Sequence, residues 1–193
     1  MVDNKIHNDD GLKKDDIVPL ANPMQVGNGL DAVVEAGPTQ AYDGDFTGKS
    51  NESFAIYQYS MFEDSDSCQI WYGVNNNPSQ LFVWENTSGN SFCNLAPVIT
   101  YKTADGMTYF IVNSYRRGAL SFNECMIFGA DQGGSFSMIY DIQGTILQKA
   151  DGSLQVEETI MNLGADGTPD YNTETYTVVI EGGKVLKSDS DKA

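Results

Sequence analysis

The feature that most constrains the fold is a series of short segments in which apolar and polar residues alternate. A period of two places alternate side chains on opposite faces of a β-strand. The segments are also rich in aromatic and β-branched residues, which favour strands. They span residues 54–61, 69–74, 80–85, 98–102, 107–115, 119–128, 135–142, 145–148, 154–160 and 175–180. Turn-forming pairs, such as Asp105-Gly106 and Gly182-Gly183, separate many of them.

Strands of this length and spacing predict a mainly β protein, either an antiparallel sandwich or a strongly bent, barrel-like sheet of about 9–10 short strands. One short N-terminal helix is predicted near residues 29–36, because Asn28 can cap it and Gly37-Pro38 ends it. Residues 1–20 mix Asp and Lys without an apolar period, which predicts a flexible acidic tail or linker. A single β-rich domain is expected over residues 21–190. A division near residue 95 stays open, although no linker marks it.

The charge balance excludes several partners. The chain has 27 acidic residues against 11 Lys and Arg, a formal charge of −16. A phosphate backbone or an anionic membrane surface would be repelled, so nucleic acid is not an expected partner. No apolar run reaches the roughly 20 residues that span a bilayer, so membrane insertion is not expected either.

The N-terminal residues contain no visible signal peptide. A cytoplasmic protein and an extracellular or cell-surface protein whose leader has been removed both fit. The abundance of Asn, Ser, Gly and Tyr is typical of bacterial cell-surface modules and favours the second. The three cysteines, Cys68, Cys93 and Cys125, have no CxxC spacing, and the single histidine is His7, so a zinc site is not expected. A disulfide between Cys68 and Cys93 and buried free thiols both remain open.

Residues 106–129 predict a β-hairpin that carries the two arginines of the chain, Arg116 and Arg117. If Arg117-Gly118 formed a two-residue turn, Asn113 would lie opposite Phe122. Glu124 would then lie on an apolar face, diagonally adjacent to Asn113. A carboxylate there must find hydrogen bonds or a cation, or stay protonated. Glu124 and Asn113 are therefore either structural or the polar floor of a ligand pocket, and Glu124 as an acid catalyst is a third reading.

Arg116 and Arg117 are candidates for binding an anionic group of a ligand, because a guanidinium grips carboxylate or phosphate through two hydrogen bonds. Alternation along a strand sends neighbouring side chains to opposite faces, which favours separate structural roles for the two arginines.

Trp71 and Trp84 are candidates for a ligand platform. If the apolar neighbours Ile70 and Val83 face the core, the two tryptophans point outward together and offer flat rings to a sugar or a partner protein. The alternative is that both faces of the sheet are covered.

An acidic loop beginning at Asp43 resembles the start of a calcium-binding EF-hand loop in its spacing of oxygen ligands. The pattern then fails, since Phe54 stands where a bidentate acid is needed and no flanking helix is predicted. Calcium is therefore the one cofactor considered, and no other is expected. Its candidate ligands are Asp43, Asp45, Thr47, Asn51 and Glu52.

Histidine-based catalysis is excluded because His7 is the only histidine and lies in the tail. No glycine pattern for nucleotide phosphates follows a strand. The leading hypothesis is a non-catalytic binding module for a glycan, peptide or protein, with no catalytic residue assigned. The alternative is a carboxylate-based, glycosidase-like hydrolase, which needs two suitably spaced acids. Candidates in or beside strands are Glu85, Glu124, Asp141, Glu157 and Glu158.

Overall fold

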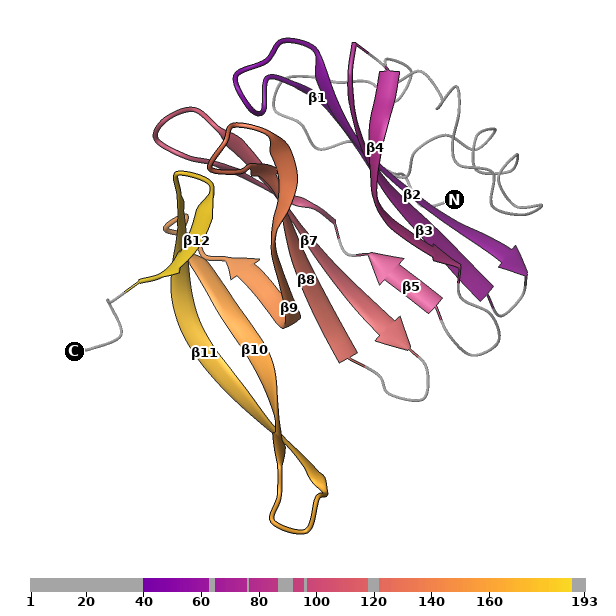
Figure 1. Cartoon of the computed structure of the whole chain (residues 1–193), viewed down its shortest axis with the longest axis vertical. Helices are drawn as coiled ribbons and strands as arrows, with labels where there is room; N and C mark the ends of the chain where they lie inside the picture. The colour runs from indigo at the N-terminus through magenta and orange to yellow at the C-terminus, as the bar shows by residue number, and fades with distance from the viewer. Residues whose placement is uncertain are drawn as a thin grey trace. The chain divides into compact units, whose positions relative to one another are not determined.

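The computed structural model describes residues 40–62, 65–75, 77–86, 92–95, 97–117 and 122–188. These ranges form strands joined by turns and contain no helix (Figure 1). The predicted mainly β, antiparallel fold is thus confirmed. The predicted helix near residues 29–36 and the tail at residues 1–20 lie outside the described residues.

The chain divides into two compact units. The first comprises Met1–Leu95 with Arg117–Ala119, and the second comprises Ala96–Arg116 with Leu120–Ala193. The expectation of one domain over residues 21–190 stays a prediction, and each unit is described by itself.

The first unit contains a four-stranded antiparallel sheet in which the strands follow one another in chain order. Its core includes Phe54, Ile56 and Ile70, which are all 0% exposed. The strands are β1 (Gln40–Gly44), β2 (Glu52–Phe62), β3 (Ser65–Val74) and β4 (Asn77–Asn86), and the short β5 (Phe92–Leu95) lies beside β3.

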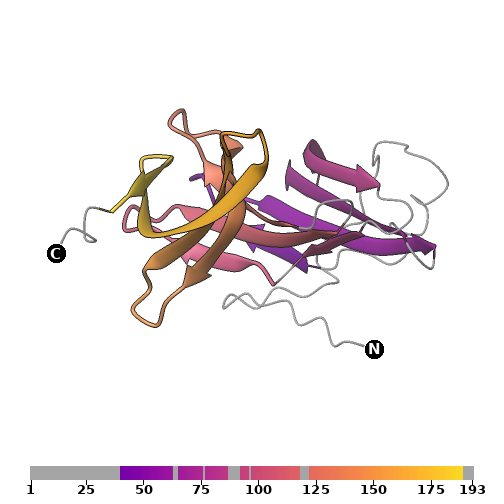
Figure 2. The same ribbon diagram turned by 90° about the horizontal axis from the view of Figure 1, so that it is seen from below.

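The second unit is a strongly curled, half-barrel antiparallel sheet (Figure 1, Figure 2). Its strands are ordered β12-β11-β10-β9-β8-β7, and β6 also pairs with β7. The strands are β6 (Ile99–Lys102), β7 (Thr108–Arg117), β8 (Phe122–Ala130), β9 (Phe136–Gln148), β10 (Leu154–Leu163), β11 (Pro169–Glu181) and β12 (Lys184–Lys187).

The long strand β9 connects the two parts of this curled sheet. Two separately predicted strand segments, 135–142 and 145–148, form this one strand. Its first part pairs with β8 as far as Gln143, and its second part pairs with β10 from Gly144 onward. A side chain at position 144 would overlap the backbone of Glu157 and Glu158. Glycine at this position therefore lets β10 approach closely at the point where the pairing of β9 with β8 ends and its pairing with β10 begins.

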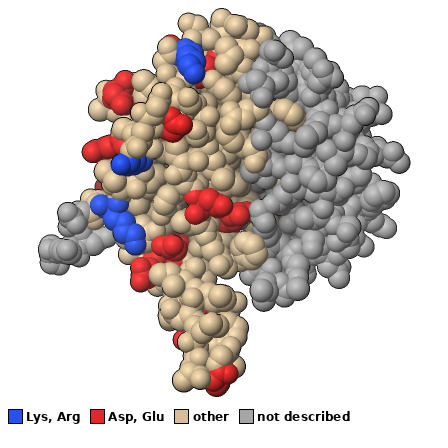
Figure 3. Space-filling view, viewed as in Figure 1, with Lys and Arg blue, Asp and Glu red and all other residues tan. Residues whose placement is uncertain are grey.

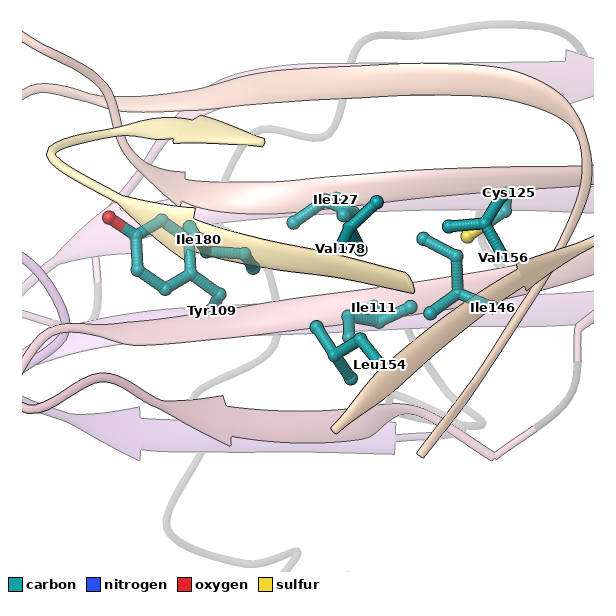
Figure 4. Close-up of a cluster of buried hydrophobic side chains, with 9 residues drawn as sticks. All are labelled: Tyr109, Ile111, Cys125, Ile127, Ile146, Leu154, Val156, Val178 and Ile180. Atoms are coloured by element: carbon teal, nitrogen blue, oxygen red, sulfur yellow. The ribbon is translucent and has the colours of Figure 1, made fainter. Parts of the chain in front are cut away.

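The core of the second unit lies on one face of the curled sheet (Figure 4). Side chains from five strands meet there, so the curl buries one continuous apolar cluster. The cluster contains Tyr109, Ile111, Cys125, Ile127, Ile146, Leu154, Val156, Val178 and Ile180. The opposite face of β7 and β8 is also buried, since Phe110, Val112 and Phe128 are 0% exposed.

Three hairpin loops of the second unit repeat the sequence Ala-Asp-Gly. In each loop the glycine N–H donates to the carbonyl three residues earlier, and the glycine has a positive φ between 80° and 86°. This is the three-residue hairpin in which glycine supplies the left-handed residue. The aspartate accepts a hydrogen bond from a nearby Thr or Ser hydroxyl, which lowers its pKa. The repeats are Ala104-Asp105-Gly106, Ala150-Asp151-Gly152 and Ala165-Asp166-Gly167.

The β7–β8 hairpin exists as predicted, but its predicted register is wrong. Asn113 lies opposite Cys125, not Phe122, and Phe122 lies opposite Arg116. The predicted two-residue turn is absent, because β7 continues to Arg117 and β8 begins at Phe122. The longer connection shifts the pairing by three residues.

Candidate functional site

A pocket of about 540 Å³ lies in the second unit, between the end of the β7–β8 hairpin and the β10–β11 hairpin. Both hairpins contribute directly paired residues to it: Tyr115 lies opposite Asn123, and Met161 lies opposite Tyr171. The pocket is lined by Tyr115, Phe122, Asn123, Gln143, Thr159, Met161 and Tyr171.

The lining combines apolar surface with neutral polar groups. Tyr115 is 39% exposed, Tyr171 45% and Met161 55%, so these large side chains remain accessible in the folded chain. Asn123, Gln143 and Thr159 add amide and hydroxyl groups that both donate and accept hydrogen bonds. No acidic or basic side chain is among the described lining residues. This arrangement suits a neutral, partly apolar ligand group.

The arginine pair marks the same end of the β7–β8 hairpin. Arg116 lies opposite Phe122, a pocket residue, and Arg117 ends β7. Their side chains lie outside the described part of the structure. Their predicted role in binding an anion therefore stays a prediction.

Glu124 and Asn113 do not form the joint polar site that the predicted register implied. Asn113 lies on the strand face that carries Ile111, and its cross-strand neighbour is the core residue Cys125. Glu124 lies opposite Ser114, on the other face. Its side chain is half-buried rather than fully buried. The three-residue shift of register is the reason, because it exchanges the faces that the two strands share.

Asn113 instead has a structural role. Its Nδ2 donates to the carbonyl oxygen of Ile146 at 2.8 Å, and its Oδ1 accepts from the N–H of Ile146 at 2.9 Å. The side-chain amide thereby takes the place of a neighbouring strand and bonds both polar backbone groups of one β9 residue. The contact ties β7 to the part of β9 that has turned away from β8.

Trp71 does not offer an exposed platform. The residue is only 7% exposed, and its Nε1 donates to Oε1 of Gln69 at 2.8 Å. Of the two alternatives left open for Trp71, the structure therefore agrees with the covered one: both Ile70 and Trp71 are buried, so both faces of β3 are covered at this point. Trp84 lies in β4 opposite Gln69, and its side chain is outside the described part of the structure.

The loop proposed to bind calcium is organised by Glu52, which is 0% exposed. Its Oε2 accepts from the backbone N–H groups of Phe46 and Thr47 at 2.6 and 2.7 Å. Its Oε1 accepts from the Thr47 and Tyr72 hydroxyls, both at 2.7 Å. Four donors fill the four acceptor positions of a carboxylate.

The other proposed calcium ligands make local contacts. Asp43 Oδ1 accepts from the N–H of Gly44 and the hydroxyl of Ser53, and Asn51 donates to Asn75. Within the described ranges, no group of three or more His, Cys, Asp or Glu is arranged to hold a metal ion. A calcium ion would have to displace donors from Glu52, and the calcium site stays a prediction.

A chain of hydrogen bonds lies beside the core of the second unit. The Tyr176 hydroxyl donates to Oε2 of Glu158 at 2.7 Å and is 2.9 Å from the Tyr140 hydroxyl. Burial is the main cause that raises the pKa of both tyrosines, and the neighbouring Glu158 adds to it. Lys187 lies 3.8 Å from the centre of the Tyr176 ring. The cluster holds two phenols in their neutral form and links β9, β10 and β11.

The acidic residues considered for a hydrolase lie in different surroundings. Glu158 is bound by Tyr176, Asp141 and Glu157 are exposed, and Glu124 is half-buried. The side chain of Glu85 lies outside the described residues. None of these acids lines the described part of the pocket.

The two cysteines whose side chains the structure describes differ in state. Cys68 is disulfide-bonded, which agrees with one of the two alternatives left open by the sequence. Cys125 is a free, buried thiol, and burial raises its pKa to about 12. Such a thiol stays protonated and is not a nucleophile at neutral pH.

Comparison with protein-family models, curated proteins and solved structures finds no match. In the described part of the chain, no helix is both long and apolar enough to cross a membrane.

None of the described residues that line the pocket is among the site residues predicted from the sequence. Tyr115 is recognisable as a strand aromatic, but Met161 and Tyr171 fall between the predicted strands 154–160 and 175–180. The structure extends these strands to Leu163 and back to Pro169. The Ala-Asp-Gly repeat at residues 165–167 is the signal that identifies this longer hairpin.

Proposed function

We propose that the protein is a non-catalytic binding module and that the pocket of the second unit is its ligand site. The supporting observation is the pocket itself: a volume of about 540 Å³, accessible tyrosine and methionine side chains, and neutral polar groups between them. Pockets of this size with an apolar lining and a few orienting polar groups are typical of ligand sites.

The lining defines the chemistry of the bound group. The rings of Tyr115 and Tyr171 offer flat apolar faces, and Met161 offers a flexible thioether that adapts to the shape of a ligand. Asn123, Gln143 and Thr159 provide hydrogen bonds without charge. In a chain of formal charge −16, a neutral lining favours an uncharged group that is partly apolar.

An extracellular or cell-surface location is part of this proposal. The disulfide bond at Cys68 supports it, because disulfides persist in oxidising compartments and are rare in the cytosol. Binding is favoured over the hydrolase alternative, since no carboxylate is among the described lining residues and a glycosidase needs two of them at its cleft.

The test is a titration of the full chain with N-acetyl-phenylalanine amide and, separately, with a neutral methyl glycoside, followed by NMR. The account predicts saturable shifts for the methyl group of Met161 with at least one probe. Tyr171→Ala should weaken that binding about tenfold, because the ring is an accessible wall of the pocket.

Met138→Ala is the matched control, since Met138 is 40% exposed but does not line the pocket. It should leave the affinity within about twofold of the parent chain. Binding that is unaffected by Tyr171→Ala, or an absence of binding by both probes, would remove the pocket as the ligand site.

A further inference from the structure

In the part of the chain that the structure describes, no strand pairs with the outer edge of β11 over much of its length. β11 pairs with β10 from Pro169 to Val178, whereas β12, its other described neighbour, pairs only with Val178–Glu181. Every residue from 169 to 175 is exposed. An exposed strand edge is a template for another strand, because its N–H and C=O groups already point in the pairing direction.

The hydrogen bonds show which groups point outward. On the β12 side, the N–H of Ser188 donates to the carbonyl of Thr177 at 2.8 Å. Backbone groups of successive residues point to opposite sides of a strand. The N–H and C=O groups of Thr175, Thr173 and Tyr171 therefore also point away from β10, and no described strand pairs with them.

The open edge is adjacent to the pocket. Tyr171 belongs to both, since it lies on the edge strand and lines the pocket together with its cross-strand neighbour Met161. The residue of an added strand that lay beside Tyr171 would carry its side chain on the same face. That side chain would enter the pocket.

The charge of the hairpin selects the partner. From Leu154 to Glu181 the chain contains acidic residues and no Lys or Arg. In Figure 3 the end of this hairpin, at the bottom of the view, shows Asp and Glu in red and no Lys or Arg in blue. Asp170 and Glu174 alternate with Tyr171 and Thr173, so they lie on the face of β11 opposite to the pocket. The acids are Glu157, Glu158, Asp166, Asp170, Glu174 and Glu181.

We infer that the ligand of this module is an extended basic peptide segment that adds as a strand to the open edge of β11. Its apolar side chains alternate with lysine or arginine: one apolar side chain enters the pocket beside Tyr171, and the basic side chains lie near Asp170 and Glu174. This inference rests on the proposed function and specifies its ligand class. A second copy of the chain is the less suitable occupant, because two edges of the same negative charge repel each other.

The test uses the full chain and the synthetic peptide acetyl-Lys-Phe-Lys-Val-Lys-amide, measured by calorimetry and NMR. Thr173→Pro removes one outward N–H and should weaken binding about tenfold. The added strand then loses one backbone hydrogen bond to β11 and clashes with the proline ring. Since this N–H does not pair with β10, the hairpin should remain folded. Thr173→Ala keeps the N–H and should bind within about twofold of the parent chain.

A second set of measurements leaves the protein unchanged and modifies the peptide. Methylation of the backbone nitrogens at Phe and Val is compared with methylation at the central Lys. Alternate N–H groups of an added strand point toward β11, so one of the two modifications should weaken binding about tenfold and the other should have little effect. The peptide acetyl-Glu-Phe-Glu-Val-Glu-amide should bind about tenfold or more weakly than the lysine peptide at low salt, a difference that shrinks as salt is added.

Strand addition is overturned if the lysine peptide does not bind, or if its affinity is insensitive to Thr173→Pro and to both methylations. It is also overturned if the chain alone dimerises and Thr173→Pro abolishes the dimer, since a second copy then occupies the edge. In each case the pocket is judged separately, by the binding of N-acetyl-phenylalanine amide or the methyl glycoside and its loss in Tyr171→Ala.

Discussion

At the scale of single residues, two polar side chains organise the backbone around them. Glu52 gathers four donors from three residues in the first unit, and Asn113 bonds both backbone groups of Ile146 in the second. The sequence indicated Glu52 only as a candidate calcium ligand, from its position in the acidic loop, and left Asn113 open between a structural role and the floor of a ligand pocket. Their actual contacts depend on strand register and loop path, which residue types alone do not determine.

Replacing Glu52 with Gln is predicted to destabilise the protein by about 1–3 kcal/mol. The amide nitrogen of glutamine is a donor, and it would face donors that now bind a carboxylate oxygen. Urea unfolding measures the change. Glu174→Gln is the control, because the side chain of Glu174 is 57% exposed and its contact with Lys187 is long, at 4.0 Å. Equal stability of the two variants would contradict the role assigned to Glu52.

The buried tyrosines predict a loss of stability at high pH. Burial raises the pKa of Tyr42 to about 12, and burial together with the hydrogen bond to Glu52 raises that of Tyr72. The folded state then holds these protons more tightly than the unfolded state, whose tyrosines titrate near pH 10. The stabilisation of the folded state by these protonated tyrosines is complete below about pH 10, and it falls as the pH rises through their folded-state pKa values.

Absorbance at about 295 nm, followed together with circular dichroism, checks this dependence on tyrosine ionisation. A group of tyrosines should ionise only as the secondary structure is lost. Ionisation of every tyrosine near pH 10 in a chain that stays folded would contradict the assignment.

At the scale of elements, the strands themselves follow from the sequence, but their partners do not. Alternation identifies β2, β3, β4, β7 and β8 closely, and it misses the short strands β1, β5 and β12. The β7–β8 register fails because Gly118 suggests a tight turn, whereas the strand pairing begins at Arg116 and Phe122. The two segments of β9 are joined in one strand because Gly144 allows a bend without ending the strand.

Gly144→Ala is predicted to destabilise the second unit by about 2 kcal/mol or more, since the new methyl group overlaps the backbone of β10. The measurement is urea unfolding together with amide exchange at Val156 and Leu154, which should become less protected. Gly133→Ala is the matched control, because its only close neighbour there is a side-chain oxygen of Asp131 at 3.3 Å. A neutral effect of Gly144→Ala would show that the bend does not require glycine.

At the scale of the whole molecule, the fold class was predictable and the candidate site was not. Composition and alternation are enough to predict antiparallel β structure. The pocket arises only when the curl of the second unit brings Tyr115 on β7 near Met161 and Tyr171 on β10 and β11. These residues are separated in sequence by several strands, so no local pattern connects them.

The disulfide at Cys68 predicts a dependence of stability on redox conditions. A reductant should lower the free energy of unfolding by about 2–4 kcal/mol, the typical contribution of a native disulfide. Unfolding with and without dithiothreitol measures the difference. Cys125→Ala, which removes the free thiol, should retain the dependence on reductant. An identical midpoint in both conditions would contradict a structural disulfide and weaken the support for an extracellular location.

The most direct test of the account is an isotope-filtered NOE spectrum of the full chain with acetyl-Lys-Phe-Lys-Val-Lys-amide. The account predicts contacts between the phenyl ring of the peptide and the methyl group of Met161, which forms a wall of the pocket beside Tyr171. Contacts of the phenyl ring only with residues outside the pocket, or no contacts at all, would contradict the claim that a side chain of the peptide enters this pocket.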